Sequence, residues 1–309
     1  MGTTTTNQTE LDKNNFKNPW IQAARPKTLF ASIGPVVLGT ALAFKNYEIF
    51  LGDIFLVTLL CALLLQISSN YINDYFDSIK GTDNEDRLGP IRVTQHGLLT
   101  TNQIQKGFLT TLGMALFFGL YLMINGGTPI IIIGLCSMWF AYAYTGGPFP
   151  LSYNGLGEVA AFVFFGPVAV MGTTYLQSHV FDLPTFIIGC GVGFISALIL
   201  AINNLRDIHS DKKTTKKTLA VIFGENFQRK MAIIFLVLAN ICVILLALVQ
   251  KNYYTMATIL LVIPFFKTWK YVYSGEISKE MNNRLAETGK YLFLYCLIMS
   301  VLIMIPYGK

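Results

Sequence analysis

Long apolar runs alternate with short polar segments along most of the chain. A helix needs roughly 20 apolar residues to cross about 30 Å of hydrocarbon. Runs near that length occupy residues 28–44, 54–72, 107–124, 129–145, 158–176, 184–203, 231–249, 254–269 and 291–305. Backbone polar groups inside a bilayer must be satisfied within their own segment, so these runs should be helices. The pattern predicts an all-α, polytopic membrane protein with about nine transmembrane helices.

Composition supports this interpretation. Of the 309 residues, 53% are hydrophobic and only 13% are charged, whereas soluble domains carry about 25% charged residues. Disordered, collagen-like and disulfide-stapled classes are therefore excluded. The five cysteines all lie in apolar runs without a C-x-x-C pair, so we expect buried hydrophobic side chains and no metal or disulfide role. Residues 1–19 form a polar tail, and residues 20–309 are expected to form one integral-membrane domain.

Basic residues follow the predicted topology. If the N-terminus is cytoplasmic, the cytoplasmic segments contain 20 of the 23 Lys and Arg residues. Short cytoplasmic loops carry such an excess in membrane proteins, so we predict an N-terminus inside and a C-terminus outside. The formal net charge of +6 then reflects orientation, and it gives no support to nucleic-acid binding.

Polar residues concentrate where two of the predicted helices end. One segment runs from Asn70 to Asp83 and the other from Asn203 to Lys217. A constant shift of 130 positions places Asn73 on Asn203 and Asp77 on Asp207. This correspondence indicates an internal duplication in which the two preceding helices are equivalent.

The spacing of these polar residues suggests a site. Asn73 and Asp77 are four residues apart and share one helical face, as do Asn203, Asp207 and Asp211. Together the two faces would place four carboxylates around one cavity, those of Asp77, Asp83, Asp207 and Asp211. Such a cluster repels itself unless cations bind, and oxygen ligands of this kind suit Mg²⁺ completed by substrate phosphates. The neighbouring cations fit a diphosphate: Arg25, Lys80, Arg206, Lys212 and Lys217.

Simpler interpretations exist for each segment alone. An acidic loop at a membrane face is often a solvated turn, and a basic run is often a topology signal or a contact for anionic lipid. The pairing of two similar segments on the same side favours a functional site, as ionisable groups near membrane spans generally do.

Several motifs resemble a known family. Asn73–Asp77 resembles the N-D-x-x-D motif of UbiA-type intramembrane prenyltransferases, Asp207-x-x-x-Asp211 resembles their second aspartate motif, and Arg25-Pro26-x-Thr28 resembles their opening segment. Further segments resemble the 1,4-dihydroxy-2-naphthoate polyprenyltransferase branch of menaquinone synthesis: 81–83, 144–158, 203–207, 217–220 and 283–288. Many relatives have a third carboxylate where this chain has Gly81, so Asp83 is a less secure metal ligand than Asp77.

The resemblance implies a helical bundle around a central cavity with a cytoplasmic cap, in a bacterial cell membrane. It implies transfer of a polyprenyl group from its diphosphate to 1,4-dihydroxy-2-naphthoate, with loss of CO₂, giving demethylmenaquinone. Membrane lipid would surround the enzyme, and no protein partner is implied. Rival activities are a UbiA-type enzyme with another acceptor (4-hydroxybenzoate, haem or a glycerol-phosphate lipid) and a membrane transporter.

Site roles follow from the same resemblance. Asn73, Asp77, Asp83, Asp207 and Asp211 would hold Mg²⁺. Arg25 and Lys217 would bind the leaving diphosphate, assisted by Arg206 and Lys80. Tyr144, Tyr153 and Glu158 are the candidates for contact with the acceptor. Aromatic faces stabilise cations at close range, and five rings are candidates to stabilise an allylic cation: Phe140, Tyr142, Tyr144, Phe162 and Phe165.

Overall fold

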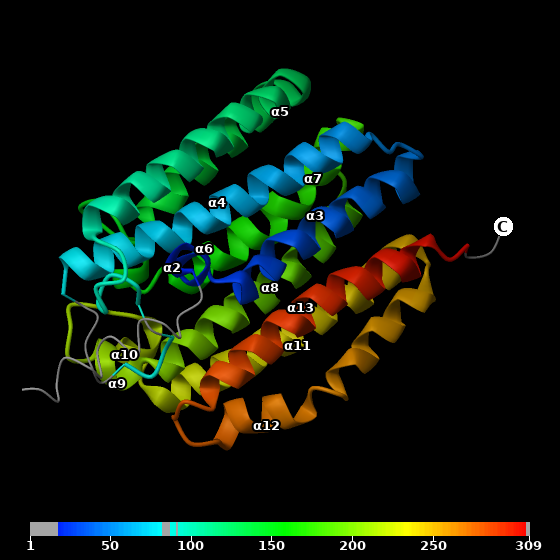
Figure 1. Ribbon diagram of the computed structural model, residues 1–309. Coiled ribbons are helices and arrows are strands. Elements are labelled where there is room, and N and C mark those ends of the chain that lie inside the picture. The colour runs from blue at the N-terminus through cyan, green and yellow to red at the C-terminus, as the bar shows by residue number, and fades with distance from the viewer. Residues whose placement is uncertain (1–17, 82–86, 91, 307–309) are drawn as a thin grey trace, which may run out of the picture.

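The protein is an all-helical bundle in the part of the chain that the structure, a computed structural model, describes: residues 18–81, 87–90 and 92–306. Figure 1 shows long helices lying side by side, most of them with their axes roughly aligned. The helices are α2 (Pro19–Ala24), α3 (Pro26–Tyr47), α4 (Gly52–Ile79), α5 (Thr101–Ala143), η1 (Leu151–Tyr153), α6 (Gly157–Val163), η2 (Phe164–Val168), α7 (Ala169–Ser178), α8 (Leu183–Arg206), α9 (Ile208–Asp211), α10 (Leu219–Phe223), α11 (Glu225–Gln250), η3 (Tyr253–Val262), α12 (Phe266–Ser274) and α13 (Met281–Met304).

Helix α5 folds back on itself. Its 43 residues would reach about 64 Å as one straight helix, twice the bilayer core. Gly127, at φ 62° and ψ −156°, interrupts the helix in a conformation open almost only to glycine. Packing shows the reversal: Ile104 lies beside Tyr71 near the end of α4, whereas Ile130 lies beside Ile54 near its start. Residues 101–143 are thus two helical arms joined at Gly127.

Within the described residues, seven helices are long and apolar enough to cross a membrane. They account for eight of the nine expected runs, because α5 contains two of them. The run 254–269 is not one continuous helix: the 3₁₀ segment η3 stops at Val262, and α12 begins at Phe266. Pro264 lies between them and lacks the backbone N–H that a continuous helix requires. The count of nine spans stays a prediction.

Helix α8 lies at the centre of the main core, packed against α11 and α13. Its residues Ile195, Leu198 and Ile202 are fully buried. Against its other side, the backbone of η2 comes so close that a Cβ on Gly166 would lie 2.5 Å from the Cα of Gly193. Only glycine permits that approach, and it fixes the position of the α6–η2–α7 segment against α8.

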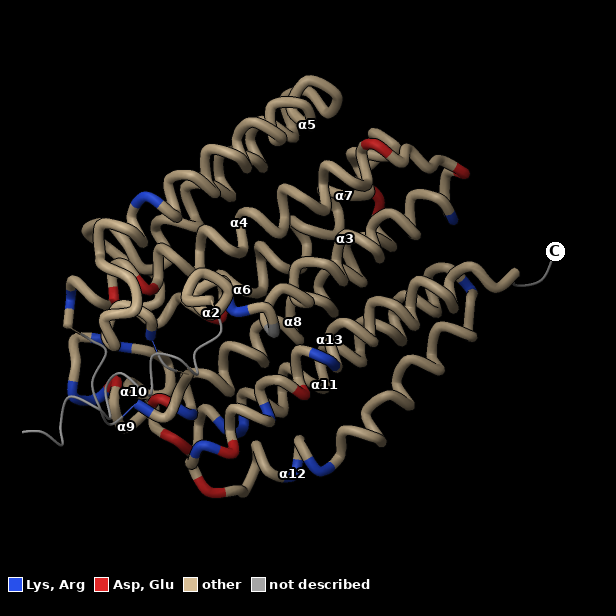
Figure 2. The backbone as a smooth tube through the Cα atoms, viewed as in Figure 1, with Lys and Arg blue, Asp and Glu red and all other residues tan. Residues whose placement is uncertain are grey.

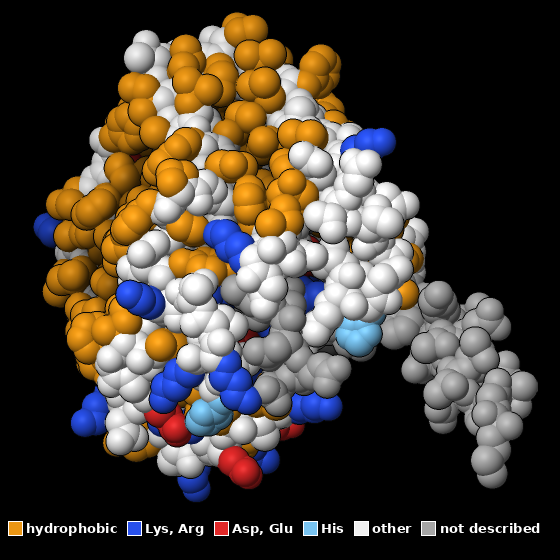
Figure 3. Space-filling model, turned by 90° about the vertical axis from the view of Figure 1, so that its left-hand side faces the viewer, with side chains coloured by type: hydrophobic (Ala, Val, Ile, Leu, Met, Phe, Trp, Pro, Cys, Tyr) orange, Lys and Arg blue, Asp and Glu red, His pale blue; other side chains and the backbone are white. Residues whose placement is uncertain are grey.

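Charged residues gather at the end of the bundle where α4 and α8 finish, which we call the polar end (Figure 2). The loops that follow α4, α5 and α8 lie there. Figure 3 looks toward this end: Lys, Arg and His side chains gather on its lower half, and hydrophobic side chains cover the adjoining surface. The distribution is that of an integral membrane protein with one charged face.

Candidate active site

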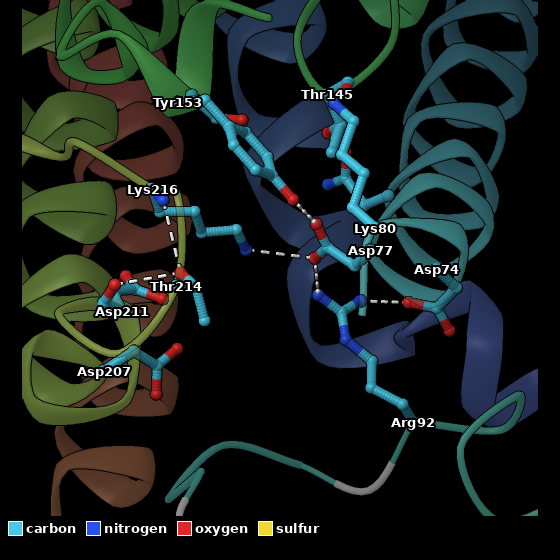
Figure 4. Close-up of polar contacts among 12 residues, drawn as sticks. Asp74, Asp77, Lys80, Arg92, Thr145, Tyr153, Asp207, Asp211, Thr214 and Lys216 are labelled. Carbon is cyan, nitrogen blue, oxygen red and sulfur yellow. Dashed lines mark hydrogen bonds and ion pairs between the residues drawn. The ribbon is translucent and has the colours of Figure 1, made fainter. Parts of the chain in front are cut away.

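A cavity of about 550 Å³ lies between α4 and α8 and reaches the polar end. The structure brings the described part of the first acidic segment, and the second segment, to this cavity. Its polar lining includes Asn73 and Asp77 from α4, and Asn203, Asp207 and Asp211 from α8 and the turn that follows. Asp77 and the pair Asp207 and Asp211 lie on facing sides, with Lys216 extending between them (Figure 4).

On the α4 side, Asp77 is surrounded by donors from distant parts of the chain. Its Oδ1 accepts a hydrogen bond of 2.7 Å from Tyr153 Oη. Its Oδ2 accepts from Arg92 Nη2 at 2.8 Å and from Lys216 Nζ at 3.2 Å. The neighbouring Asp74 pairs with both Arg25 and Arg92. Two buried carboxylates are therefore held by three cations.

On the α8 side, the charge of Asp207 is balanced by the residue next to it. Arg206 donates from Nε at 2.8 Å and from Nη2 at 2.5 Å to the two carboxylate oxygens. Arg87 Nε lies 3.7 Å away. Burial raises the pKa of Asp207, but the charge and hydrogen bonds of Arg206, together with the charges of Arg87 and Lys216, outweigh this, and the pKa lies below its ordinary value. Asp207 is therefore held ionised.

Asp211 is the least compensated of the three carboxylates. Burial raises its pKa to about 6, and the nearby negative charge of Asp207 adds to this, whereas Lys216 opposes it. Its backbone carbonyl accepts a 2.9 Å hydrogen bond from Thr214 Oγ1. An added cation beside Asp207 and Asp211 would relieve this repulsion.

The donor set fits Mg²⁺ shared with a phosphate ligand. Among the described residues, no three His, Cys, Asp or Glu side chains come close enough to form a metal site by themselves. Five hard oxygen donors nevertheless line one cavity. Mg²⁺ is commonly held by one or two carboxylates, waters and substrate phosphates, without an all-protein cage. The predicted ligand Asp83 lies outside the described residues.

The predicted diphosphate-binding cations separate into two groups. Arg25 and Arg206 line the cavity, Arg25 being bonded to Asp74. Lys217 and Lys80 instead line a second pocket beside it. Lys216 takes the place on the cavity that Lys217 was expected to hold. Burial lowers the pKa of Lys80 below its ordinary value, although Asp77 counteracts this.

Of the three residues predicted to contact the acceptor, only one lines the cavity. Tyr144 lines the cavity, and burial raises its pKa above the ordinary value. Tyr153 reaches Asp77, as described. Glu158 is buried behind the wall, where its Oε1 accepts from Asn204 Nδ2 at 2.9 Å and from Gln228 Nε2 at 2.8 Å. Glu158 thus orients Asn204, which does line the cavity.

Sequence reasoning missed Arg87 and Arg92. Both line the cavity and lie in the loop between α4 and α5, where they counted only toward the topology. Their position just after the acidic segment could have indicated a role, because buried carboxylates need nearby cations.

Away from the polar end, the cavity becomes apolar. Phe140 and Phe164 stack there with ring centroids 3.9 Å apart, and Phe165 also lines the wall. The expected rings of Tyr142 and Phe162 do not line it. The cavity continues to Leu122 and Ile130 near the turn of α5. A polar mouth above an apolar depth suits an amphiphile with an anionic head and a long tail.

Known proteins resemble this chain along most of its length. The model of the UbiA prenyltransferase family matches residues 32–302. The 1,4-dihydroxy-2-naphthoate octaprenyltransferase of Haemophilus influenzae is 32% identical over 290 residues, 91% of this chain and 94% of that protein. The enzyme of the same name from Mycobacterium tuberculosis is 41% identical over 207 residues, 67% of this chain and 70% of that protein.

The fold also has a solved counterpart. The structure of a UbiA homolog from Archaeoglobus fulgidus bound to GPP and Mg²⁺ superposes with a TM-score of 0.69 at 15% identity, covering 93% of this chain and 100% of that one. At this identity the likeness shows the fold alone.

Proposed function

The chain belongs to the UbiA prenyltransferase family, and we propose that it transfers a polyprenyl group from its diphosphate to 1,4-dihydroxy-2-naphthoate. The bond between the allylic carbon and the diphosphate oxygen breaks, and that carbon bonds to the ring carbon that carried the carboxylate. Diphosphate and CO₂ leave, and the prenylated ring is the hydroquinone of demethylmenaquinone. The relatives named for this reaction support the choice of acceptor.

The observation that carries the proposal is the form of the cavity. Two acidic helix ends and several cations surround its mouth, and its depth is apolar. A diphosphate head at the mouth leaves the prenyl tail among apolar walls, where each buried CH₂ is worth about 0.8 kcal/mol. The walls exclude water from a developing allylic cation, and the faces of Phe140 and Tyr144 stabilise such a charge.

We assign the ligand roles as follows. Asn73, Asp77, Asp207 and Asp211 hold Mg²⁺, with Asp83 as a further candidate. When bound, Mg²⁺ neutralises charge on the leaving diphosphate. Arg25, Arg92, Arg206 and Lys216 bind its oxygens, and Lys80 and Lys217 act from the second pocket. Tyr144, which lines the cavity, contacts the acceptor. Tyr153 positions Asp77 through its hydroxyl, and Glu158 positions Asn204.

The acceptor needs no protein nucleophile, because its own hydroxyl groups make the ring electron-rich. The protein therefore orients the ring against the allylic carbon. Holding two reactants in this way removes a large part of the activation barrier of a bimolecular reaction. We place the polar end in the cytoplasm, with the N-terminus inside and the C-terminus outside, because nearly all basic residues then face inward.

The test is an assay of the full chain in detergent or membranes with 1,4-dihydroxy-2-naphthoate, a polyprenyl diphosphate and Mg²⁺, followed by mass spectrometry. We expect metal-dependent demethylmenaquinone and CO₂, and loss of both with EDTA. Prenylation of 4-hydroxybenzoate instead would overturn the acceptor and leave the family assignment intact. A folded protein that prenylates neither acceptor would favour transport.

A further inference from the structure

A second pocket of about 310 Å³ lies beside the cavity at the polar end. It is lined by Lys80, Gly147, Pro148, Pro150, Tyr153, Asn154, Thr215 and Lys217. The described residues that line it include two lysines and no carboxylate. Both lysines and Thr215 are exposed to solvent. The pocket therefore presents positive charge at the surface, directly beside the catalytic cavity.

One side chain, Tyr153, stands between the pocket and the cavity. The Nζ of Lys80, which lines the pocket, lies 4.2 Å from the centroid of the Tyr153 ring. The Nζ of Lys216, which lines the cavity, lies 5.2 Å from the same centroid. The Tyr153 hydroxyl donates to Asp77 at 2.7 Å. Figure 4 shows this ring between the two lysines.

Successive residues in segment 215–218 line the second pocket and the cavity in turn. Thr215 and Lys217 line the pocket, whereas Lys216 and Thr218 line the cavity. The backbone N–H of Lys217 donates to the carbonyl of Tyr153 at 3.0 Å. The consecutive residues Lys216 and Lys217 thus lie on the cavity and on the pocket respectively, and Lys80 joins Lys217 on the pocket, so positive charge is present on both sides of Tyr153.

We propose that this second pocket binds inorganic diphosphate released by prenyl transfer and passes it to solution, with Tyr153 as the movable partition. The proposal rests on the proposed function, which supplies the anion. A multiply charged anion leaving between Asp77 and Asp207 needs positive charge along its path. Lys216 offers the first contact, and Lys80 and Lys217 the next, so rotation of Tyr153 connects the cavity with the pocket.

A charge series at Thr215 tests the proposal. Thr215→Asp lowers and Thr215→Lys raises the pocket's charge by one at an exposed position, and Thr215→Asn is the neutral reference. Binding of radiolabelled inorganic diphosphate to each full-length variant is measured in neutral detergent. We expect binding about tenfold weaker with Asp than with Asn, and several-fold tighter with Lys. Steady-state inhibition by added diphosphate should follow this order, and the single-turnover rate of prenyl transfer should change less than the binding does.

Lys212→Gln is the matched control, because it makes the same change in net charge as Thr215→Asp on an exposed residue that lines neither space. An equal effect of Lys212→Gln, or binding that is constant across the series, would overturn the pocket assignment. Binding in nanodiscs that contain anionic lipid tests whether a lipid headgroup is the ligand instead. If anionic lipid removes the charge dependence seen in neutral nanodiscs, the pocket's ligand is a lipid headgroup and the proposal fails.

The two proposals fail separately. The binding measurement needs no prenyl acceptor, so it reads the pocket even if 1,4-dihydroxy-2-naphthoate is not prenylated. Conversely, normal prenyl transfer with charge-independent diphosphate binding would leave the enzyme assignment standing and remove the exit pocket.

Discussion

The two acidic helix ends correspond in sequence but balance their charges differently. Asp77 takes its donors from the loop after α4, from the loop before α6 and from the segment after α9, through Arg92, Tyr153 and Lys216. Asp207 takes its principal partner from the preceding residue, Arg206. The charge of Asp77 is therefore balanced by residues distant in sequence, whereas the charge of Asp207 is balanced mainly by the adjacent Arg206.

This difference has a chemical consequence. The cations beside Asp77 come from segments outside α4, so we expect a metal ion to replace them at the carboxylate while they bind a phosphate, with α4 itself unchanged. The Arg206–Asp207 pair is further fixed by Asn203 and Asn282, each 2.9 Å from an Arg206 nitrogen. We infer that the α8 side is the rigid wall of the site and the α4 side the adaptable one.

The largest expected effect is the loss of activity in Asp77→Asn and Asp207→Asn. Each change removes a charge that would hold Mg²⁺ while keeping the shape of the side chain. We expect prenyl transfer to fall by about two to three orders of magnitude in both, a range seen when key electrostatic groups are removed. Mass spectrometry of the product measures it, and near-normal turnover in both folded variants would refute the metal site.

Stability should distinguish the two variants. Asp207→Asn leaves Arg206 buried, with its side chain 3% exposed, and breaking such a pair costs about 3–5 kcal/mol. After Asp77→Asn, Arg92 still pairs with Asp74, so a smaller loss follows. Thermal unfolding in detergent checks this. The double variant R206Q/D207N should regain part of the loss, and equal melting of D77N and D207N would contradict the comparison.

The contacts around Asp77 also predict that the consecutive residues Lys216 and Lys217 contribute unequally to activity. Lys216→Gln removes the ammonium 3.2 Å from Asp77, and we expect kcat/KM to fall by about ten- to a hundredfold, as for other charged hydrogen bonds. Lys217→Gln acts from the second pocket and should cost about threefold or less, an effect of the size of an exposed ion pair. Steady-state kinetics with varied polyprenyl diphosphate measures both, and the reverse order would restore the role first expected of Lys217.

Tyr153→Phe should have an effect no larger than the smallest one expected for Lys216→Gln. It removes a single hydrogen bond to Asp77 and keeps the ring between Lys80 and Lys216, so we expect about a tenfold loss of kcat/KM. Because the Tyr153→Phe ring still separates the two spaces, diphosphate binding should stay within about twofold. A larger loss than that of Lys216→Gln would mean that the hydroxyl contacts substrate.

Much of this site was predictable because helix periodicity places residues four apart on one face. Asn73, Asp77, Asp207 and Asp211 lie on the predicted cavity for that reason. Loops obey no such rule. Which of Lys216 and Lys217 faces inward, and how Arg87 and Arg92 return to the carboxylates, depends on tertiary packing of non-helical segments.

The fold, too, was predictable where it depends on helix periodicity and not where it depends on tertiary packing. Apolar length predicted the long helices, but the break at Pro264 separates η3 from α12 in a run that was apolar throughout. Glu158 was expected to contact the acceptor because segment 144–158 resembles the 1,4-dihydroxy-2-naphthoate polyprenyltransferase branch. It is instead buried against Gln228, a partner 70 residues away that no local pattern indicated.

The turn at Gly127 decides how residues 101–143 cover α4. Residues 101–143 cross and recross the bundle with only a few residues at the turn, far from the polar end. The turn carries no charged residue within positions 120–135, so this pair of arms leaves and regains the polar end without placing a charged loop on the far side. One uninterrupted stretch of sequence therefore covers α4 at both of its ends, the first arm near its end and the second near its start.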